Sequence, residues 1–366
     1  GHLKKKIREL EGLRSVAFSC MKENEILELP AGHFVRAHEL SSSPLMYWHP
    51  PVQGKVPVCT SFLEQERVTK SRPLFDVYLY AVGGSNAQAN SLSSAERYNL
   101  NQNRWEVVAN TNTARHGATA CFLGPNLYVA GGFDSEGSTS LASVERYNHI
   151  KNKWITVAEM NTERECAGTC VLGGRLYAIG GLGTRGNTMA FVERYDEKKN
   201  KWAGVRDMRT ARWGLGACVL NGRVYAVGGC GKKRGKNLSS VERYDEERNV
   251  WEAAADMSTA RWGVSACVLG RRLYAVGGCN GRGHALSSVE RYDETRDRWE
   301  AVADMSTARY GAGAYVLDGR LYAVGGRDAH HKFLSSAERY DEEKDQWEAV
   351  PDMCTARWCA GICSSC

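Results

Sequence analysis

The feature that most constrains this chain is a unit of 48 or 49 residues that occurs six times. A pair of glycines marks each unit, and the first glycines of the pairs are Gly83, Gly131, Gly180, Gly228, Gly277 and Gly325. Glu-Arg-Tyr follows each pair, a tryptophan stands seven residues after the tyrosine, and an arginine stands ten residues after the tryptophan. All variation in length lies between the glycine pair and the tyrosine. Such strict spacing indicates repeated structural units that pack against their neighbours.

Each unit contains four short runs of β-branched and aromatic residues that are separated by Gly, Asp, Asn or Lys. Runs of this kind predict four strands joined by turns. One twisted four-stranded sheet leaves its apolar faces uncovered, and stacking the sheets around an axis buries them. The sequence therefore predicts an all-β protein of six four-stranded antiparallel sheets, with the tyrosines and tryptophans filling the space between them.

The glycine pair, the tyrosine and the tryptophan together resemble the kelch repeat over residues 73–366. Among kelch proteins the similarity is greatest to the kelch domain of BTB–kelch substrate adaptors. The resemblance implies a six-bladed β-propeller that binds other proteins and performs no catalysis. It further implies substrate recognition for a cullin-RING ubiquitin ligase. A cytoskeletal, actin-associated or signalling scaffold without a ligase is the alternative that the same resemblance leaves open.

The two ends of the repeat region predict how the ring closes. The strand expected at residues 76–84 has no partner strand before it, whereas the tail after Arg357 repeats the first strand of a unit and then stops. Cys363 stands at the same position as Cys121 and Cys170 in earlier units. We therefore expect the C-terminal strand to pair with residues 76–84, which also removes two open sheet edges.

Residues 1–72 do not share the repeat. Leu3, Ile7 and Leu10 have helical spacing, which predicts a short amphipathic helix or the end of a coiled coil. Residues 21–72 are interpreted as a poorly ordered linker. The net charge of +6 is mild for a nucleic-acid-binding protein, and no apolar run is long enough to span a bilayer. The odd count of 13 cysteines favours a reducing compartment, so a cytoplasmic and possibly nuclear location is expected.

Some cysteines and histidines of the chain are candidates for redox or metal chemistry. Cys230, which follows a glycine pair beside basic residues, is a candidate redox-sensitive thiol if exposed, and Cys279 holds the equivalent position. His284, His330 and His331 are the histidines that a copper radical oxidase, an enzyme class with a similar propeller, would require. No tyrosine and cysteine stand beside these histidines, and Cys363 to Cys366 is a single C-x-x-C without a second pair. We therefore expect no catalytic residues, no metal and no cofactor.

The strand order places the loops after the glycine pairs and the turns with the repeated arginine on one face. In adaptors that this chain resembles, partners contact the residue after the glycine pair, the turn arginine and the residue after that arginine. The corresponding candidate contacts are Arg115, His116, Phe133, Arg164, Glu165, Arg212, Trp213, Arg261, Trp262, Arg309, Tyr310, Arg327, Arg357 and Trp358. An arginine that occurs in all six units can equally hold the turn, and this alternative stays open.

The charges in the variable loops suggest the chemistry of the partner. Basic residues gather in the loops of units three to six, at Arg185, Lys232, Lys233, Arg234, Lys236, Arg282, Arg327 and Lys332. Acidic residues on this face are few, the main ones being Asp134, Glu136 and Glu165 around unit two. A positive face with large aromatic residues favours an acidic peptide segment as partner. Nucleic acid would require a longer basic stripe and is the weaker alternative.

Overall fold

The computed structural model of the chain describes residues 26–29, 33–36, 77–232 and 236–365. The chain divides into two compact units, Gly1–Thr69 and Lys70–Cys366. In the first unit, β1 (Ile26–Leu29) pairs antiparallel with β2 (His33–Arg36). The linker interpretation did not predict this pairing, although Pro-Ala-Gly, which are turn residues, separate the two strands in the sequence. The amphipathic helix expected at residues 3–10 lies outside the described residues.

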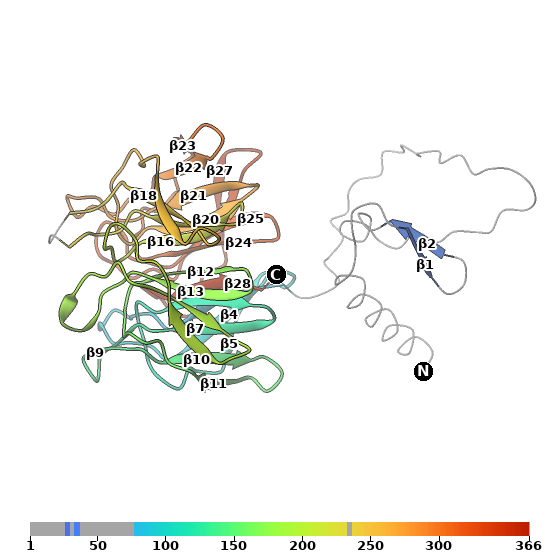
Figure 1. Cartoon of the computed structure of the whole chain (residues 1–366), viewed down its shortest axis with the longest axis horizontal. Helices are drawn as coiled ribbons and strands as arrows, with labels where there is room; N and C mark the ends of the chain where they lie inside the picture. Colours follow the sequence, from blue (N-terminus) through green and yellow to red (C-terminus); the bar gives the residue numbers. More distant parts are fainter. Residues whose placement is uncertain (1–25, 30–32, 37–76, 233–235, 366) are drawn as a thin grey trace, which may run out of the picture. The chain divides into compact units, whose positions relative to one another are not determined.

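The second unit is a ring of six blades, each a four-stranded antiparallel sheet (Figure 1). Blade 1 consists of β28 (Gly361–Ser364), β3 (Tyr78–Val82), β4 (Ala95–Asn99) and β5 (Arg104–Val108). Blade 2 consists of β6 (Thr119–Leu123), β7 (Asn126–Ala130), β10 (Val144–Asn148) and β11 (Lys153–Val157). Blade 3 consists of β12 (Gly168–Leu172), β13 (Arg175–Ile179), β14 (Val192–Asp196) and β15 (Lys201–Gly204).

The remaining blades repeat the same order. Blade 4 consists of β16 (Gly216–Leu220), β17 (Arg223–Val227), β18 (Val241–Asp245) and β19 (Val250–Ala254). Blade 5 consists of β20 (Ser265–Leu269), β21 (Arg272–Val276), β22 (Val289–Asp293) and β23 (Arg298–Val302). Blade 6 consists of β24 (Gly313–Leu317), β25 (Arg320–Val324), β26 (Ala337–Asp341) and β27 (Gln346–Val350). The loop of blade 2 adds a short hairpin of β8 (Phe133–Asp134) and β9 (Thr139–Ser140), and the loop of blade 3 adds one 3₁₀ turn, η2 (Thr184–Gly186). The predicted fold class is confirmed.

Ring closure follows the predicted register. β28 pairs antiparallel with β3, and Cys363 lies opposite Tyr80. In blade 2 the equivalent pair is Cys121 and Tyr128. The last strand of the chain therefore completes the first blade, and no blade in the described ring lacks its innermost strand.

The core consists of apolar clusters, each shared by two neighbouring blades. One such cluster includes Tyr225 and Val227 of blade 4 together with Leu273 and Tyr292 of blade 5. The repeated tryptophan also joins blades by a hydrogen bond, because the Nε1 atom of Trp154 donates to the carbonyl oxygen of Ala109 in blade 1 at 2.8 Å. Aromatic burial and polar contacts thus act together where the blades meet.

The glycine pair is required where a loop touches the next blade. Gly83 has a φ of +65°, and a Cβ atom there would lie 2.4 Å from the carbonyl oxygen of Arg115. The second glycine, Gly84, donates its N–H to that same carbonyl at 2.8 Å. Only glycine permits both the backbone conformation and this approach. Among the residues that the structure describes, no helix is sufficiently long and apolar to cross a membrane.

Candidate functional site

We call the end of the ring that carries the loops after the glycine pairs and the turns with the repeated arginine the loop face. In every blade, the residue after the turn arginine forms a β-bridge with the residue after the glycine pair. The six bridges are Ser85–Trp358, His116–Phe133, Glu165–Leu182, Trp213–Cys230, Trp262–Cys279 and Tyr310–Arg327. The two kinds of candidate contact residue are therefore brought together, and the backbone holds each pair in place.

Aromatic side chains form a continuous series across five blades of this face. Ring centroids lie 5.0 Å apart for Trp213 and Trp262, 5.4 Å for Trp262 and Tyr310, and 6.2 Å for Tyr310 and Trp358. The series continues from Trp358 to His116 at 6.0 Å and from His116 to Phe133 at 5.4 Å. We call these residues the aromatic arc: Trp213, Trp262, Tyr310, Trp358, His116 and Phe133. Tyr310 is itself only 5% exposed, whereas the tryptophans are partly exposed.

Arg327 lies beside one part of the aromatic arc. Its guanidinium carbon lies 4.0 Å from the ring centroid of Phe333 and 4.2 Å from that of Trp358. Stacking of this kind orients a guanidinium and keeps its N–H groups available. Within the described part of the chain, Arg327 forms no ion pair. Its Nε atom and the Nε1 atom of Trp358 are buried donors without an acceptor, and neither is open to the surface. The guanidinium of Arg327 is partly exposed and has no carboxylate partner there, so this position suits an anionic ligand.

His116 stacks on Trp358 and lies close enough to Arg327 for the charge of the guanidinium to act on it. Its Nδ1 atom lies 2.9 Å from the hydroxyl of Ser91, which in turn donates to the carbonyl oxygen of Phe133. Burial and then the positive charge of Arg327 lower the pKa of His116 below its ordinary value. The imidazole is therefore neutral at pH 7, and Arg327 supplies the positive charge at this position. Burial raises the pKa of Glu165, which occupies the gap in the arc.

The structure corrects the expectation for the six turn arginines. Their side chains are at most 1% exposed, and each forms an ion pair with the glutamate of the Glu-Arg-Tyr motif in its own blade. The six pairs are Arg115–Glu145, Arg164–Glu193, Arg212–Glu242, Arg261–Glu290, Arg309–Glu338 and Arg357–Glu96. These arginines hold the turns, and in this conformation they cannot contact a partner.

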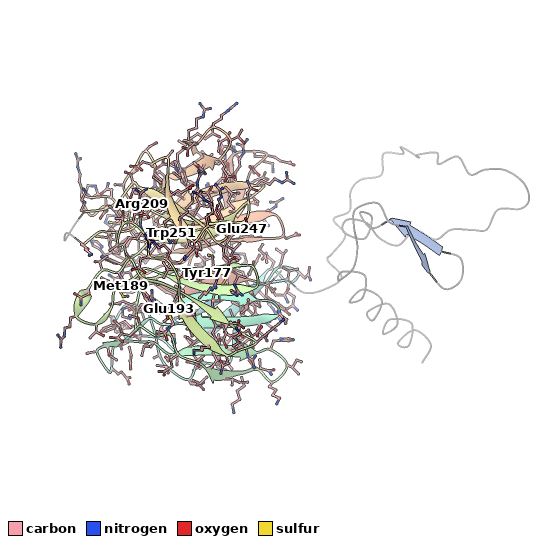
Figure 2. The ribbon with its side chains drawn as sticks, viewed as in Figure 1. Tyr177, Met189, Glu193, Arg209, Glu247 and Trp251 are labelled. Atoms are coloured by element: carbon pink, nitrogen blue, oxygen red, sulfur yellow. The ribbon has the colours of Figure 1, made fainter. Side chains whose placement is uncertain are left out.

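Blade 3 shows the hydrogen bonds that hold one of these pairs. Arg164 donates to the carbonyl oxygens of Gly180 at 2.8 Å and Phe191 at 3.0 Å, and to Glu193 at 2.6 Å. Glu193, labelled in Figure 2, also accepts the backbone N–H of Asn161 at 2.8 Å. The glutamate was not identified from the sequence as the arginine's partner, although its occurrence in all six units was a signal of a buried role.

The variable loops carry the exposed basic residues. Arg185, Lys232, Lys236, Arg282 and Lys332 are exposed, whereas Lys233 and Arg234 lie outside the described residues. With the turn arginines excluded, the positive charge on the loop face rests on these loops and on Arg327. Phe333, which supports Arg327, was missed by the sequence analysis because it lies in a loop that varies in length between units.

The candidate redox thiols are less accessible than the sequence suggested. Cys230 and Cys279 are 5% and 3% exposed, and burial raises the pKa of the Cys279 thiol. The condition for a redox-sensitive Cys230, exposure beside the lysines, is therefore not met. Over residues 77–232 and 236–365, no group of three or more histidines, cysteines and carboxylates is arranged to hold a metal ion. His331 instead contacts the hydroxyl of Tyr310 through Nδ1 at 3.0 Å.

Comparison with known proteins identifies the class to which this propeller belongs. The KLHDC2/KLHL20/DRC7 kelch-repeats domain model matches residues 71–255, and the kelch motif model matches residues 260–306 and 308–353. The chain belongs to the kelch-repeat family, whose propellers are protein-interaction modules. The solved structure titled "Structure of YjhT" is similar in fold, with a TM-score of 0.62 and 16% identity over 74% of this chain and 97% of that chain. The search of curated proteins found no match.

Proposed function

We propose that the loop face binds an acidic peptide segment of a partner protein. The observation that carries this proposal is Arg327, a guanidinium stacked between Phe333 and Trp358 with no carboxylate partner within the described residues. A glutamate or aspartate of the partner supplies the carboxylate that the partly exposed guanidinium of Arg327 lacks within the described residues. The site thus favours partners that place a carboxylate next to Arg327.

The rest of the loop face suits the same ligand. Trp213 and Trp262 present partly exposed apolar surface next to the arginine site, as anchor residues of protein interfaces do. The exposed Lys232, Lys236 and Arg282 extend the positive charge over blades 4 and 5. Long-range attraction by these loops accelerates association with an acidic segment, whereas Arg327 and the tryptophans slow its dissociation.

We further propose that the chain recognises substrates for a cullin-RING ubiquitin ligase. Support comes from the resemblance of the repeats to BTB–kelch adaptors, whose BTB and BACK regions contact the cullin. A cytoskeletal or signalling scaffold uses the same face without a ligase. Both functions fit the cytoplasmic or nuclear location that the odd cysteine count favours.

The experiment that tests the proposal compares proteins retained from a cell lysate by the wild-type chain and by Arg327→Glu. We expect the wild type to retain proteins with acidic segments and the variant to lose them. Retention of the same proteins by both forms would contradict the proposed site. Depletion of the full-length protein in cells then separates the two functions, because only a ligase adaptor changes the ubiquitination of the retained proteins.

A further inference from the structure

A closed ring of backbone hydrogen bonds surrounds the axis of the propeller beneath the aromatic arc. It is formed by the second residue after each turn arginine, and each of these residues donates its N–H to the carbonyl oxygen of the equivalent residue in the preceding blade at 2.7 to 2.9 Å. We call this the turn ring, and its members in order are Gly117, Cys166, Gly214, Gly263, Gly311 and Cys359.

Two of the six positions in the turn ring carry a side chain that the backbone disfavours. Every member has a positive φ, between +50° and +61°, which suits glycine. Cys166 and Cys359 adopt it with φ values of +50° and +51°. Non-glycine residues rarely adopt this conformation, and such strain is concentrated at functional sites. The two exceptions are both cysteines, so a role for their thiols is worth testing.

The two thiols lie close together on one side of the turn ring. Gly117 separates the cysteines, since it donates to the carbonyl oxygen of Cys359 at 2.9 Å and accepts from the N–H of Cys166 at 2.7 Å. The Cys166 sulfur lies over Gly117, 2.9 Å from where a Cβ atom on that glycine would stand. The neighbouring Cys359 thiol and then burial raise the pKa of Cys166 well above its usual value.

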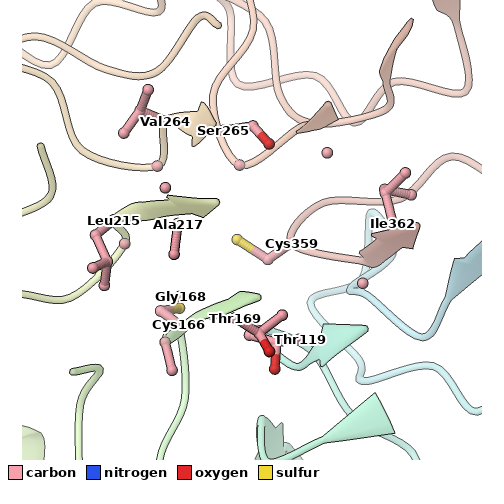
Figure 3. A pocket seen from close by; sticks show the side chains of 18 of the residues that line it. Thr119, Cys166, Gly168, Thr169, Leu215, Ala217, Val264, Ser265, Cys359 and Ile362 are labelled. Atoms are coloured by element: carbon pink, nitrogen blue, oxygen red, sulfur yellow. The ribbon is translucent and has the colours of Figure 1, made fainter. Parts of the chain in front are cut away.

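Both cysteines also line the central cavity of the propeller, which has a volume of about 150 Å³. Figure 3 shows the Cys359 thiol directed into the open centre, with Cys166 on the adjoining wall. The other walls consist mainly of glycine and alanine, and the hydroxyls of Thr119, Thr169 and Ser265 are weaker ligands for a soft cation than a thiolate. A small ion therefore has access to both sulfurs from the cavity.

The spacing of the pair favours a bridging ion over a disulfide. Hydrogen-bonded chains lie roughly 5 Å apart, so residues two steps around a six-membered ring are separated by roughly 8 Å. A disulfide requires Cα atoms within about 7 Å. Two metal–thiolate bonds of about 2.3 Å each, by contrast, span about 4.6 Å between sulfurs, which side chains converging from such positions can reach.

We propose that Cys166 and Cys359 bind one thiophilic cation that accepts two ligands, namely Cu(I). Soft thiolate ligands select Cu(I), and the absence of a third ligand group in the described residues excludes cations that require four. On binding, each thiol loses its proton to solvent and each sulfur donates one electron pair to the ion. Copper is neither oxidised nor reduced, and the complex carries one negative charge.

The test is a titration of the fully reduced whole chain with Cu(I), without oxygen, against the chromophoric chelator bicinchoninate. We expect the wild type to withhold one Cu(I) per chain that both Cys166→Gly and Cys359→Gly fail to withhold. Glycine is the residue found at the other four positions of the turn ring, so these variants keep the backbone conformation. Circular dichroism and thermal unfolding confirm that they are folded.

The matched control is Cys354→Ser, which removes an exposed thiol outside the turn ring. We expect this variant to withhold copper as the wild type does. The proposal is overturned if the wild type withholds no copper or if the glycine variants withhold as much as the wild type.

Discussion

Arg357 and Glu96 are separated by 261 residues in the sequence, yet their side chains form an ion pair at 2.9 Å with each about 1% exposed. The equivalent arginine and glutamate of blade 2, Arg115 and Glu145, are only 30 residues apart. In blade 1 the same contact therefore joins the C-terminal turn to β4, close to where β28 completes the sheet. Closure of the ring combines strand pairing with a buried ion pair.

Replacing Arg357 by methionine is expected to destabilise the ring by about 3 kcal/mol or more, because removing one partner leaves the other charge buried. Chemical denaturation of the purified chain measures this free energy of unfolding. Arg104→Met is the matched control, since Arg104 is 65% exposed and its ion pair is expected to contribute less than about 1 kcal/mol. Equal stability of the two variants would show that the buried pair does not hold the blade.

Truncating the chain tests the contribution of strand pairing to ring closure. Removing residues 358–366 deletes β28, so blade 1 loses its innermost strand and two sheet edges open. We expect a large fall in the thermal midpoint. Removing residues 1–50 is expected to leave the midpoint nearly unchanged, because every strand of the six blades lies between residues 78 and 364. The opposite order of stability in the two truncations would refute the closure account.

The pKa of His116 is expected to depend on the charge of Arg327. Burial lowers the pKa of His116 most, and the positive charge of Arg327 lowers it further. In Arg327→Gln the imidazolium loses an unfavourable neighbour, so the pKa of His116 rises but stays below its ordinary value because the ring is still buried. A proton NMR titration of the histidines measures the shift. Arg271→Gln, at the turn between β20 and β21, is the control, and an equal shift there would contradict the proximity of Arg327.

Trp262 is expected to anchor the partner. It contacts both Trp213 and Tyr310 in the aromatic arc, so its truncation removes apolar surface from the proposed interface and leaves a gap in the arc. Trp262→Ala should weaken partner binding by about 2 kcal/mol or more. Isothermal calorimetry with a retained partner segment measures the loss. If the affinity is unchanged while binding still depends on Arg327, the interface lies elsewhere on the loop face.

The sequence was sufficient to predict the ring because the periodic residues specify the strands and turns within each repeat. The spacing of the glycine pair, tyrosine and tryptophan specifies four strands and their register, and the position of Cys363 predicts the pairing of β28 with β3. The pairing of β1 with β2 was missed, because two four-residue strands outside the repeat give no sustained pattern.

The candidate site was harder to predict, because its contacts cross between blades or lie in loops. An arginine present in all six units, such as Arg164, fits a buried and an exposed role equally well, and only the structure shows its contact with Glu193. The stacking of Arg327 on Trp358 joins blade 6 to blade 1, and its stacking on Phe333 depends on the conformation of a variable loop. No spacing rule connects these residues.

The central claim is that the loop face selects negatively charged peptides through Arg327, and selection from a random peptide library tests it most directly. The wild-type chain is expected to enrich peptides with clustered Asp and Glu next to apolar residues. Arg327→Glu is expected to lose this enrichment, and Arg271→Glu, which alters charge at a turn between β20 and β21, is expected to keep it. Enrichment of neutral or basic peptides by the wild type, or the same acidic peptides from Arg327→Glu, would contradict the account.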